Sequence, residues 1–137
     1  MPDTDYATMP AGLELNALIA EKVMGWRHDS AGYWLDADGE QVAWSAQNVR
    51  AAIYPEAVWS PSTDPTADYE VLCHVRKTWT PVAISRFAWE LAMLWEARVD
   101  NKSVVAARAF AGDINYLPGD FARAGLMTLA AMAKDKG

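Results

Sequence analysis

Apolar residues recur at helical spacing near the start of the chain. In the stretch GLELNALIAEKVMGW, the apolar residues that share one side of a helix are Leu15, Ile19, Val23 and Trp26. Gly25 stands where a helix commonly ends. The pattern therefore predicts an amphipathic helix that covers a core and ends near Gly25.

A turn signal follows in YWLDADGEQVAW, where Asp38 and Gly39 favour a two-residue hairpin turn. Counting outward from this turn pairs Leu35 with Val42 and Tyr33 with Trp44 and places all four on one face. The sequence predicts a hairpin in which Trp34 occupies the opposite face. The next stretch, SAQNVRAAIY, predicts one or two helical turns capped by Ser45.

The stretch FAWELAMLWEARV combines strand periodicity with helix-forming residues. Every second position is apolar: Phe87, Trp89, Leu91, Met93, Trp95, Ala97 and Val99. This period of two favours a strand, paired across a turn at Asn101 and Lys102 with residues 104–110. The alternative is a helix over residues 84–99, which the Ala, Leu, Met and Glu content favours.

Two further helices begin at aspartates. Asp64 is a predicted N-cap followed by Pro65 at the first helical position, and Asp120 is a predicted cap for a C-terminal helix. Helices at both ends, one in the middle and two hairpins predict an α+β fold, with helices packed on a small antiparallel sheet as an α/β/α-type sandwich. We expect a flexible N-terminus over residues 1–10 and a single domain over residues 11–134.

Composition narrows the classes of function. The chain has 137 residues, 52% of them hydrophobic, and a net charge of −6 with basic residues scattered along it, which argues against binding of nucleic acid. A single cysteine excludes an intramolecular disulfide. No apolar run resembles a signal peptide or a membrane span, so we expect a cytoplasmic protein that does not bind membranes.

Candidate catalytic groups are few. Cys73 and His74 are sequence neighbours and point about 100° apart on a helix, so they are poorly placed to form a dyad. His74 is expected to face water beside Glu70, and Asp68 to lie in the first helical turn, where the helix dipole favours a carboxylate. The alternative is a functional role for His74 with acids brought from elsewhere.

Two loops carry further candidates. The Asp36, Asp38 and Glu40 set in DADGE superficially resembles a calcium loop, but it lacks the later bidentate Glu, and a plain hairpin turn is the preferred interpretation. His28, between Arg27 and Asp29, is a second candidate for a functional histidine. The sequence predicts no metal site and no cofactor.

Seven tryptophans are many for a core of this size. Partly exposed Trp is enriched at binding surfaces, and the candidates for an interaction surface are Trp34, Trp59 and Trp79. The alternative is that most of these rings cover the small core.

Two stretches resemble a known family. The segments ELNALIAEKVMGW (residues 14–26) and WSPSTDPTADYEVLCHV (residues 59–75), followed by an Ala-rich C-terminal helix, are similar to the phage ABA sandwich domain, found in small proteins of tailed phages and prophages. The region between Thr80 and Tyr116 carries no matching motif. The resemblance implies a helix–sheet–helix sandwich without established activity or catalytic residues.

These observations support two functional hypotheses. The first is a non-catalytic phage or prophage accessory protein in the host bacterial cytoplasm that binds a host or phage protein, or a second copy of itself. It predicts an exposed apolar patch or a stable oligomer. The second is a small enzyme or ligand-binding domain that uses His28 or His74 with nearby carboxylates in a concave pocket.

Overall fold

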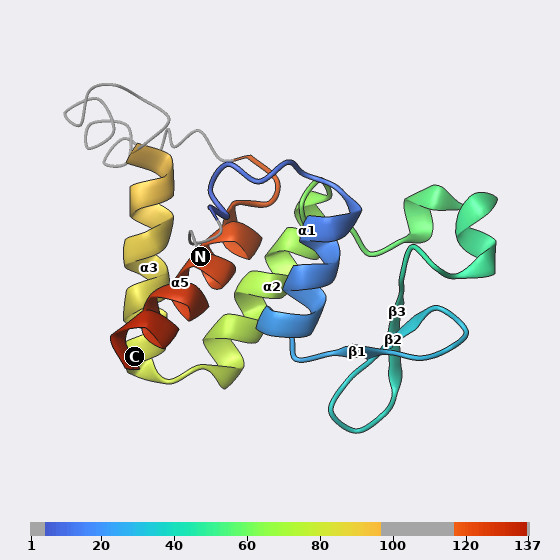
Figure 1. The fold of residues 1–137 in the computed structure, drawn as a ribbon, viewed down its shortest axis with the longest axis horizontal. Helices are drawn as coiled ribbons and strands as arrows, with labels where there is room; N and C mark the ends of the chain where they lie inside the picture. The colour runs from blue at the N-terminus through green and yellow to red at the C-terminus, as the bar shows by residue number, and fades with distance from the viewer. Residues whose placement is uncertain (1–4, 97–116, 137) are drawn as a thin grey trace.

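The structure is a computed structural model that describes residues 5–96 and 117–136. Its long helices are α2 (Pro65–Thr78), α3 (Pro81–Glu96) and α5 (Asp120–Lys136). The first helix consists of α1 (Leu13–Leu18) continued by a π-helical turn, η1 (Ile19–Val23). A small sheet follows it, and Figure 1 shows the long helices gathered at the other end of the molecule. The predicted α+β class, with helices packed against a small antiparallel sheet, is confirmed.

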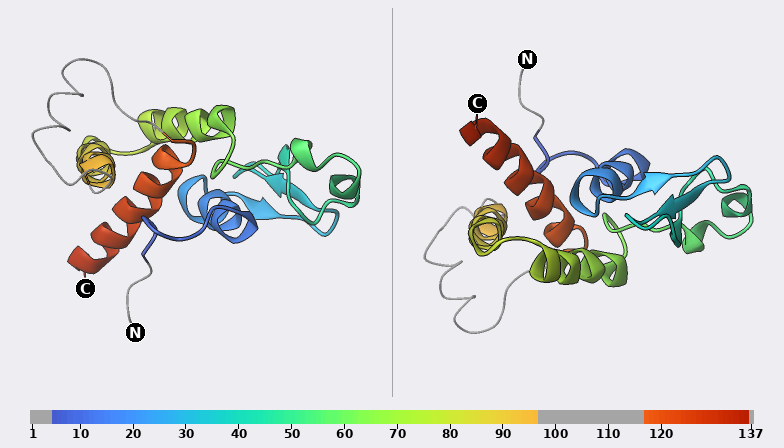
Figure 2. Two further views of the ribbon diagram at one scale, coloured as in Figure 1. Left: turned by 90° about the horizontal axis from the view of Figure 1, so that it is seen from above. Right: turned by 90° about the horizontal axis from the view of Figure 1, so that it is seen from below.

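Helix α5 lies at the centre of the helical group, in contact with α2, α3 and η1 (Figure 2). The core residues Leu15, Ile19 and Val23 of the first helix are buried, as their spacing predicted. Gly125 allows α5 and η1 to approach closely, because a Cβ atom at this position would lie 3.1 Å from a methyl carbon of Val23. The core thus depends on a small residue at this helix crossing.

Three short antiparallel strands form the sheet in the order β1 (Arg27–His28), β2 (Tyr33–Leu35) and β3 (Gln41–Trp44). The predicted pairing of Tyr33 with Trp44 is confirmed, whereas Leu35 pairs with Gln41 and not with Val42. The register shifts by one residue between Trp34 and Leu35, as in a β-bulge. Counting from the turn could not reveal this extra residue.

A loop of two 3-10 helices, η2 (Val49–Ala52) and η3 (Pro55–Ala57), extends from the sheet. We call residues 45–57 the arm. Its base is closed by a parallel bridge between Trp44 and Val58. The first turn was predicted with Ser45 as its cap, but Asn48 caps η2 by accepting a hydrogen bond from the Arg50 N–H.

The predicted hairpin over residues 87–110 is wrong for the part that the structure describes. Residues 81–96 form α3, which the alternative interpretation anticipated, and the proposed partner strand lies outside the described residues. Helix-forming residues outweigh the period-two pattern here because α3 is apolar on more than one side. Phe87 and Leu94 are buried, whereas Trp89 and Met93 face solvent.

Helix α2 begins as predicted. Asp64 Oδ1 accepts a hydrogen bond from the Thr66 N–H over 3.1 Å, and Pro65 is the first helical residue. Val71 and Val75 are fully buried on the predicted apolar side. Within the described residues, no helix is long and apolar enough to cross a membrane.

Near the N-terminus, Tyr6 and Met9 are partly buried against the core. The Tyr6 carbonyl accepts a hydrogen bond from the Arg123 guanidinium at 2.6 Å, which ties this segment to α5.

Candidate functional site

Two aspartates in the helical group are fully buried and serve the fold. Asp68, in the first turn of α2 as predicted, accepts hydrogen bonds from the Phe121 and Ala122 N–H groups at 3.2 and 2.8 Å. Asp68 of α2 therefore meets the first free N–H groups of α5. Asp120, the predicted cap, is the first residue of α5, and its Oδ2 accepts from the Leu117 N–H and the Trp95 indole N–H, both at 2.9 Å.

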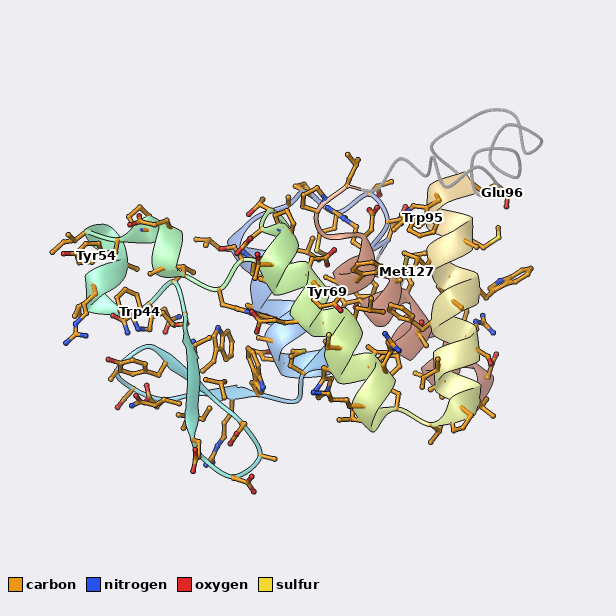
Figure 3. All side chains as sticks on the ribbon, turned by 180° about the vertical axis from the view of Figure 1, so that it is seen from behind. Trp44, Tyr54, Tyr69, Trp95, Glu96 and Met127 are labelled. Atoms are coloured by element: carbon orange, nitrogen blue, oxygen red, sulfur yellow. The ribbon has the colours of Figure 1, made fainter. Side chains whose placement is uncertain are left out.

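Trp95 consequently joins α3 to the start of α5 (Figure 3). Together Asp68 and Asp120 connect three helices by hydrogen bonds. Their full burial and their backbone partners favour a structural role over catalysis.

The loop acids are also structural. Asp36 Oδ1 accepts from the Asp38 and Glu40 N–H groups, which confirms the plain hairpin turn. Asp29 Oδ1 in the same way accepts from the Ala31 and Tyr33 N–H groups. The Asp29 carboxylate thus stabilises its own turn. Among the described residues, no group of three His, Cys, Asp or Glu side chains could hold a metal ion.

His74 is half-buried, which corrects the prediction that it faces water. Burial lowers the pKa of its imidazole, and the backbone of Val23 opposes this shift. Partial burial raises the pKa of Glu70, and the Asp64 carboxylate raises it further. No hydrogen bond joins His74 to a carboxylate in the part of the chain that the structure describes. The histidine-with-acid site is therefore not formed at His74.

Two of the three candidate tryptophans are more enclosed than expected. Trp34 is only 4% exposed and Trp59 only 8%, so the partial exposure expected for these rings is wrong. Trp59 packs on Trp26 with ring centroids 4.6 Å apart. Trp79 is half-buried and meets Phe87 edge to face. Trp34 and Trp59 therefore serve mainly in packing, as the alternative interpretation proposed.

His28 does line a concave site. A pocket of about 440 Å³ lies between the first helix and the sheet, and we call it the α1–sheet pocket. The residues that line it are Leu13, Glu14, Asn16, Ala17, Glu21, His28, Trp34, Ser45, Ala46, Gln47, Val58 and Trp59. His28 stacks on Trp34 with ring centroids 4.4 Å apart. The structure thus contains the concave pocket of the ligand-binding hypothesis, but no hydrogen bond joins His28 to an acid among the described residues.

Asn16 is the most buried polar side chain that α1 contributes to this pocket. It is 7% exposed, and its Oδ1 accepts a hydrogen bond from the Ser62 N–H at 3.0 Å. Its amide nitrogen donates to no group within the described residues. The pocket thus offers a hydrogen-bond donor that the fold itself does not use.

A second candidate site lies at the far end of the molecule, on α3. Val82, Trp89 and Met93 are 75%, 61% and 39% exposed. At 100° per residue they fall on one side of the helix, about 120° around it from the buried residues Ala83, Phe87 and Leu94. We call the exposed side the outer α3 face.

Sequence reasoning missed both the outer α3 face and the glutamates of the α1–sheet pocket. Reading residues 87–99 as a strand placed Trp89 and Met93 with Phe87 on one face. Projecting the same residues as a helix would have separated them. For Glu14 and Glu21 the signal was their spacing of seven residues on a helix whose apolar side was already assigned.

No family model, curated protein or solved structure matches this chain significantly. The resemblance to the phage ABA sandwich domain therefore stays a prediction.

Proposed function

We propose that the protein is a non-catalytic binding module that docks a second protein on the outer α3 face. The observation that carries this proposal is the 61% exposure of Trp89 between Val82 and Met93 on a helix whose buried side is also apolar. A helix that is apolar on both sides normally has partners on both sides. Within the described residues, α3 packs against α5, whereas Val82, Trp89 and Met93 stay exposed.

The size and chemistry of these side chains suit a protein interface. Trp and Met are enriched where proteins meet, and one large aromatic ring near the centre of a contact often dominates its binding energy. The buried acids, in contrast, are committed to helix ends. Binding is therefore better supported than catalysis.

Charge favours a basic partner over a second copy of this chain. The protein carries a net charge of −6, so two copies would repel each other. Arg86, beside the outer α3 face, is offset by two carboxylates, with its guanidinium 2.9 Å from Glu90 Oε1 and 3.8 Å from Asp135 Oδ2. We propose a partner whose apolar patch is bordered by Lys or Arg.

The resemblance to the phage ABA sandwich domain supports a place among phage or prophage accessory proteins. In that setting the partner is a host or phage protein in the bacterial cytoplasm.

The experiment starts with capture of partners from bacterial lysate by the tagged chain, followed by calorimetry with each purified partner. Trp89→Ala with Met93→Ala should weaken binding at least tenfold without loss of thermal stability, because both side chains are exposed. The matched control is Val49→Ala with Ile53→Ala, which removes exposed apolar residues from the arm. Raising the salt concentration should weaken binding to a basic partner.

Three results would contradict the proposal. One is equal binding by the α3 variant, and another is loss of binding in the arm variant alone. The third is a concentration-dependent dimer that Trp89→Ala abolishes, because the occupant would then be a second copy.

A further inference from the structure

The α1–sheet pocket is built from four separate parts of the chain. Helix α1 with η1 forms one wall, the sheet supplies His28 and Trp34, and the start of the arm and Trp59 complete it. The Ser45 N–H donates to Gly32 O at 2.9 Å, and the Trp59 N–H donates to Trp44 O at 3.1 Å. These backbone bonds fix the segments that line the pocket, so its shape exists without a ligand.

The charge of the lining has one sign. Among the described residues around the pocket, Glu14 and Glu21 are acidic, and none is Lys or Arg. Neither glutamate forms an ion pair within the described residues, unlike Glu90, which is paired with Arg86. Two carboxylates beside a mostly apolar hollow create a negative potential there.

The aromatic rings that line the pocket also favour a cationic ligand. Trp34, stacked on His28, and Trp59 both line the pocket. Aromatic rings attract ammonium and guanidinium groups, most strongly where water is excluded. An apolar ligand body between these rings and Ala17 would also lose contact with water.

We propose that the α1–sheet pocket binds a small organic cation, an aliphatic ammonium or guanidinium group, with Glu14 and Glu21 as its counter-charges. The two glutamates are seven residues apart, on the order of 10 Å along a helix. A linear diamine can therefore approach both. The free amide N–H of Asn16 can in addition bind an acceptor oxygen next to the cationic group, as in a peptide.

The cation can be a free amine or the Lys or Arg side chain of a polypeptide, and the probes separate these sources. We would titrate the protein by calorimetry with 1,5-diaminopentane, ethylguanidinium, and the acetyl methylamides of lysine and arginine. The neutral probe is 1,5-pentanediol. Binding at least tenfold tighter for the acetyl methylamides identifies a polypeptide side chain, and the reverse identifies a free amine.

Glu14→Gln with Glu21→Gln should raise the Kd of the cationic probes at least tenfold. The matched control is Glu56→Gln, because Glu56 is an exposed acid of η3 outside the pocket. Ala46→Trp, a second variant, fills the rim while it keeps both carboxylates, and it should also abolish binding. The indole proton of Trp34 should shift in NMR spectra when a cation binds to the wild type.

The inference is overturned if no cationic probe binds at 50 mM, if the diol binds as tightly as the diamine, or if the double glutamine variant binds like Glu56→Gln. It does not rest on the proposed function. Trp89→Ala, which tests the outer α3 face, should leave cation binding within twofold of the wild type.

Discussion

Two buried polar side chains, Asp68 and Asn16, each join a helix to a distant segment, but they differ in how many of their hydrogen-bonding groups are used. We call the contact at Asp68 the closed junction and the contact at Asn16 the open junction. At the junction of α2 and α5, both oxygens of Asp68 accept backbone N–H bonds and no part of the side chain reaches solvent. Beside the α1–sheet pocket, Asn16 uses its oxygen for the Ser62 N–H, while its amide nitrogen donates to no group among the described residues. Both side chains come from a helix and bond to the backbone of a distant segment.

The difference shows how burial separates structural polar groups from available ones. A fully bonded buried group stabilises one arrangement of the chain and has nothing left for a ligand. A partly bonded group beside a hollow keeps a donor for another molecule. We therefore expect substitutions at the closed junction to change stability, and substitutions at the open junction to change binding.

The largest expected effect on stability is that of Asp68→Ala. The substitution leaves the Phe121 and Ala122 N–H groups without their acceptor, which should lower the free energy of unfolding by about 3 kcal/mol. Urea unfolding followed by circular dichroism measures this change. The control is Asp135→Ala, because Asp135 is largely exposed. A loss below about 1 kcal/mol for Asp68→Ala would show that the closed junction is not a stabilising feature.

Gly125→Val should have the next largest effect. A Cβ atom at this position would already lie 3.1 Å from Val23, and the branched side chain would push α5 away from η1 at a cost of about 2 kcal/mol. Val23→Ala in the same chain should recover part of this loss. If the two substitutions are simply additive in urea unfolding, the close contact does not limit packing here.

Asn16→Ala tests the open junction directly. It removes one hydrogen bond to the buried Ser62 N–H, so we expect a loss of about 1.5 kcal/mol, about half of that for Asp68→Ala. The same variant should weaken binding of the lysine acetyl methylamide more than binding of 1,5-diaminopentane, because only the former carries an acceptor oxygen. Equal weakening of both probes would show that Asn16 acts on the pocket through the fold alone.

Asp64→Ala removes an exposed cap and should cost about 1 kcal/mol. Asp64→Asn is the matched variant, since it keeps an acceptor oxygen for the Thr66 N–H and should recover most of the stability. Thermal unfolding of the three proteins compares them. A similar loss in both variants would point to the charge, and not the cap, as the source of stability.

The smallest expected effect is a pH dependence at His74. Because burial lowers the pKa of the folded imidazole below its ordinary value of 6.5, the unfolded chain binds the proton first as the pH falls. Stability should therefore decrease as the pH falls from 6.5 towards the lowered pKa. Urea unfolding at several pH values should show a weaker decrease for His74→Asn. An unchanged slope would assign the effect to other groups.

The sequence predicted the local features of this fold better than its long-range contacts. The Asp64 cap, the Asp36 turn and the apolar side of the first helix depend on residues close in sequence. Asp68 could not be assigned in the same way, because its partners lie 53 and 54 residues away. Nothing in the residues around Asp68 specifies which helix end it will meet.

The candidate sites also depend on long-range contacts that the sequence does not specify. Trp34 was predicted on the face of the hairpin opposite Tyr33 and Leu35, and the sequence contains no signal that His28 would stack on it. The exposure of Trp89 was missed for another reason. An apolar residue at every second position fits a strand as well as a helix that is apolar all round. A pocket formed by four segments of the chain can be identified only from the tertiary structure.

The bridge between Trp44 and Val58 has a practical consequence for labelling the protein. Because this contact closes the base of the arm, the path from Ser45 to Ala57 leaves and re-enters the body at adjacent points. A peptide epitope inserted between Ile53 and Tyr54, both exposed, would lengthen a closed loop whose entropic cost grows only slowly with length. The arm is thus a natural attachment point for a reporter.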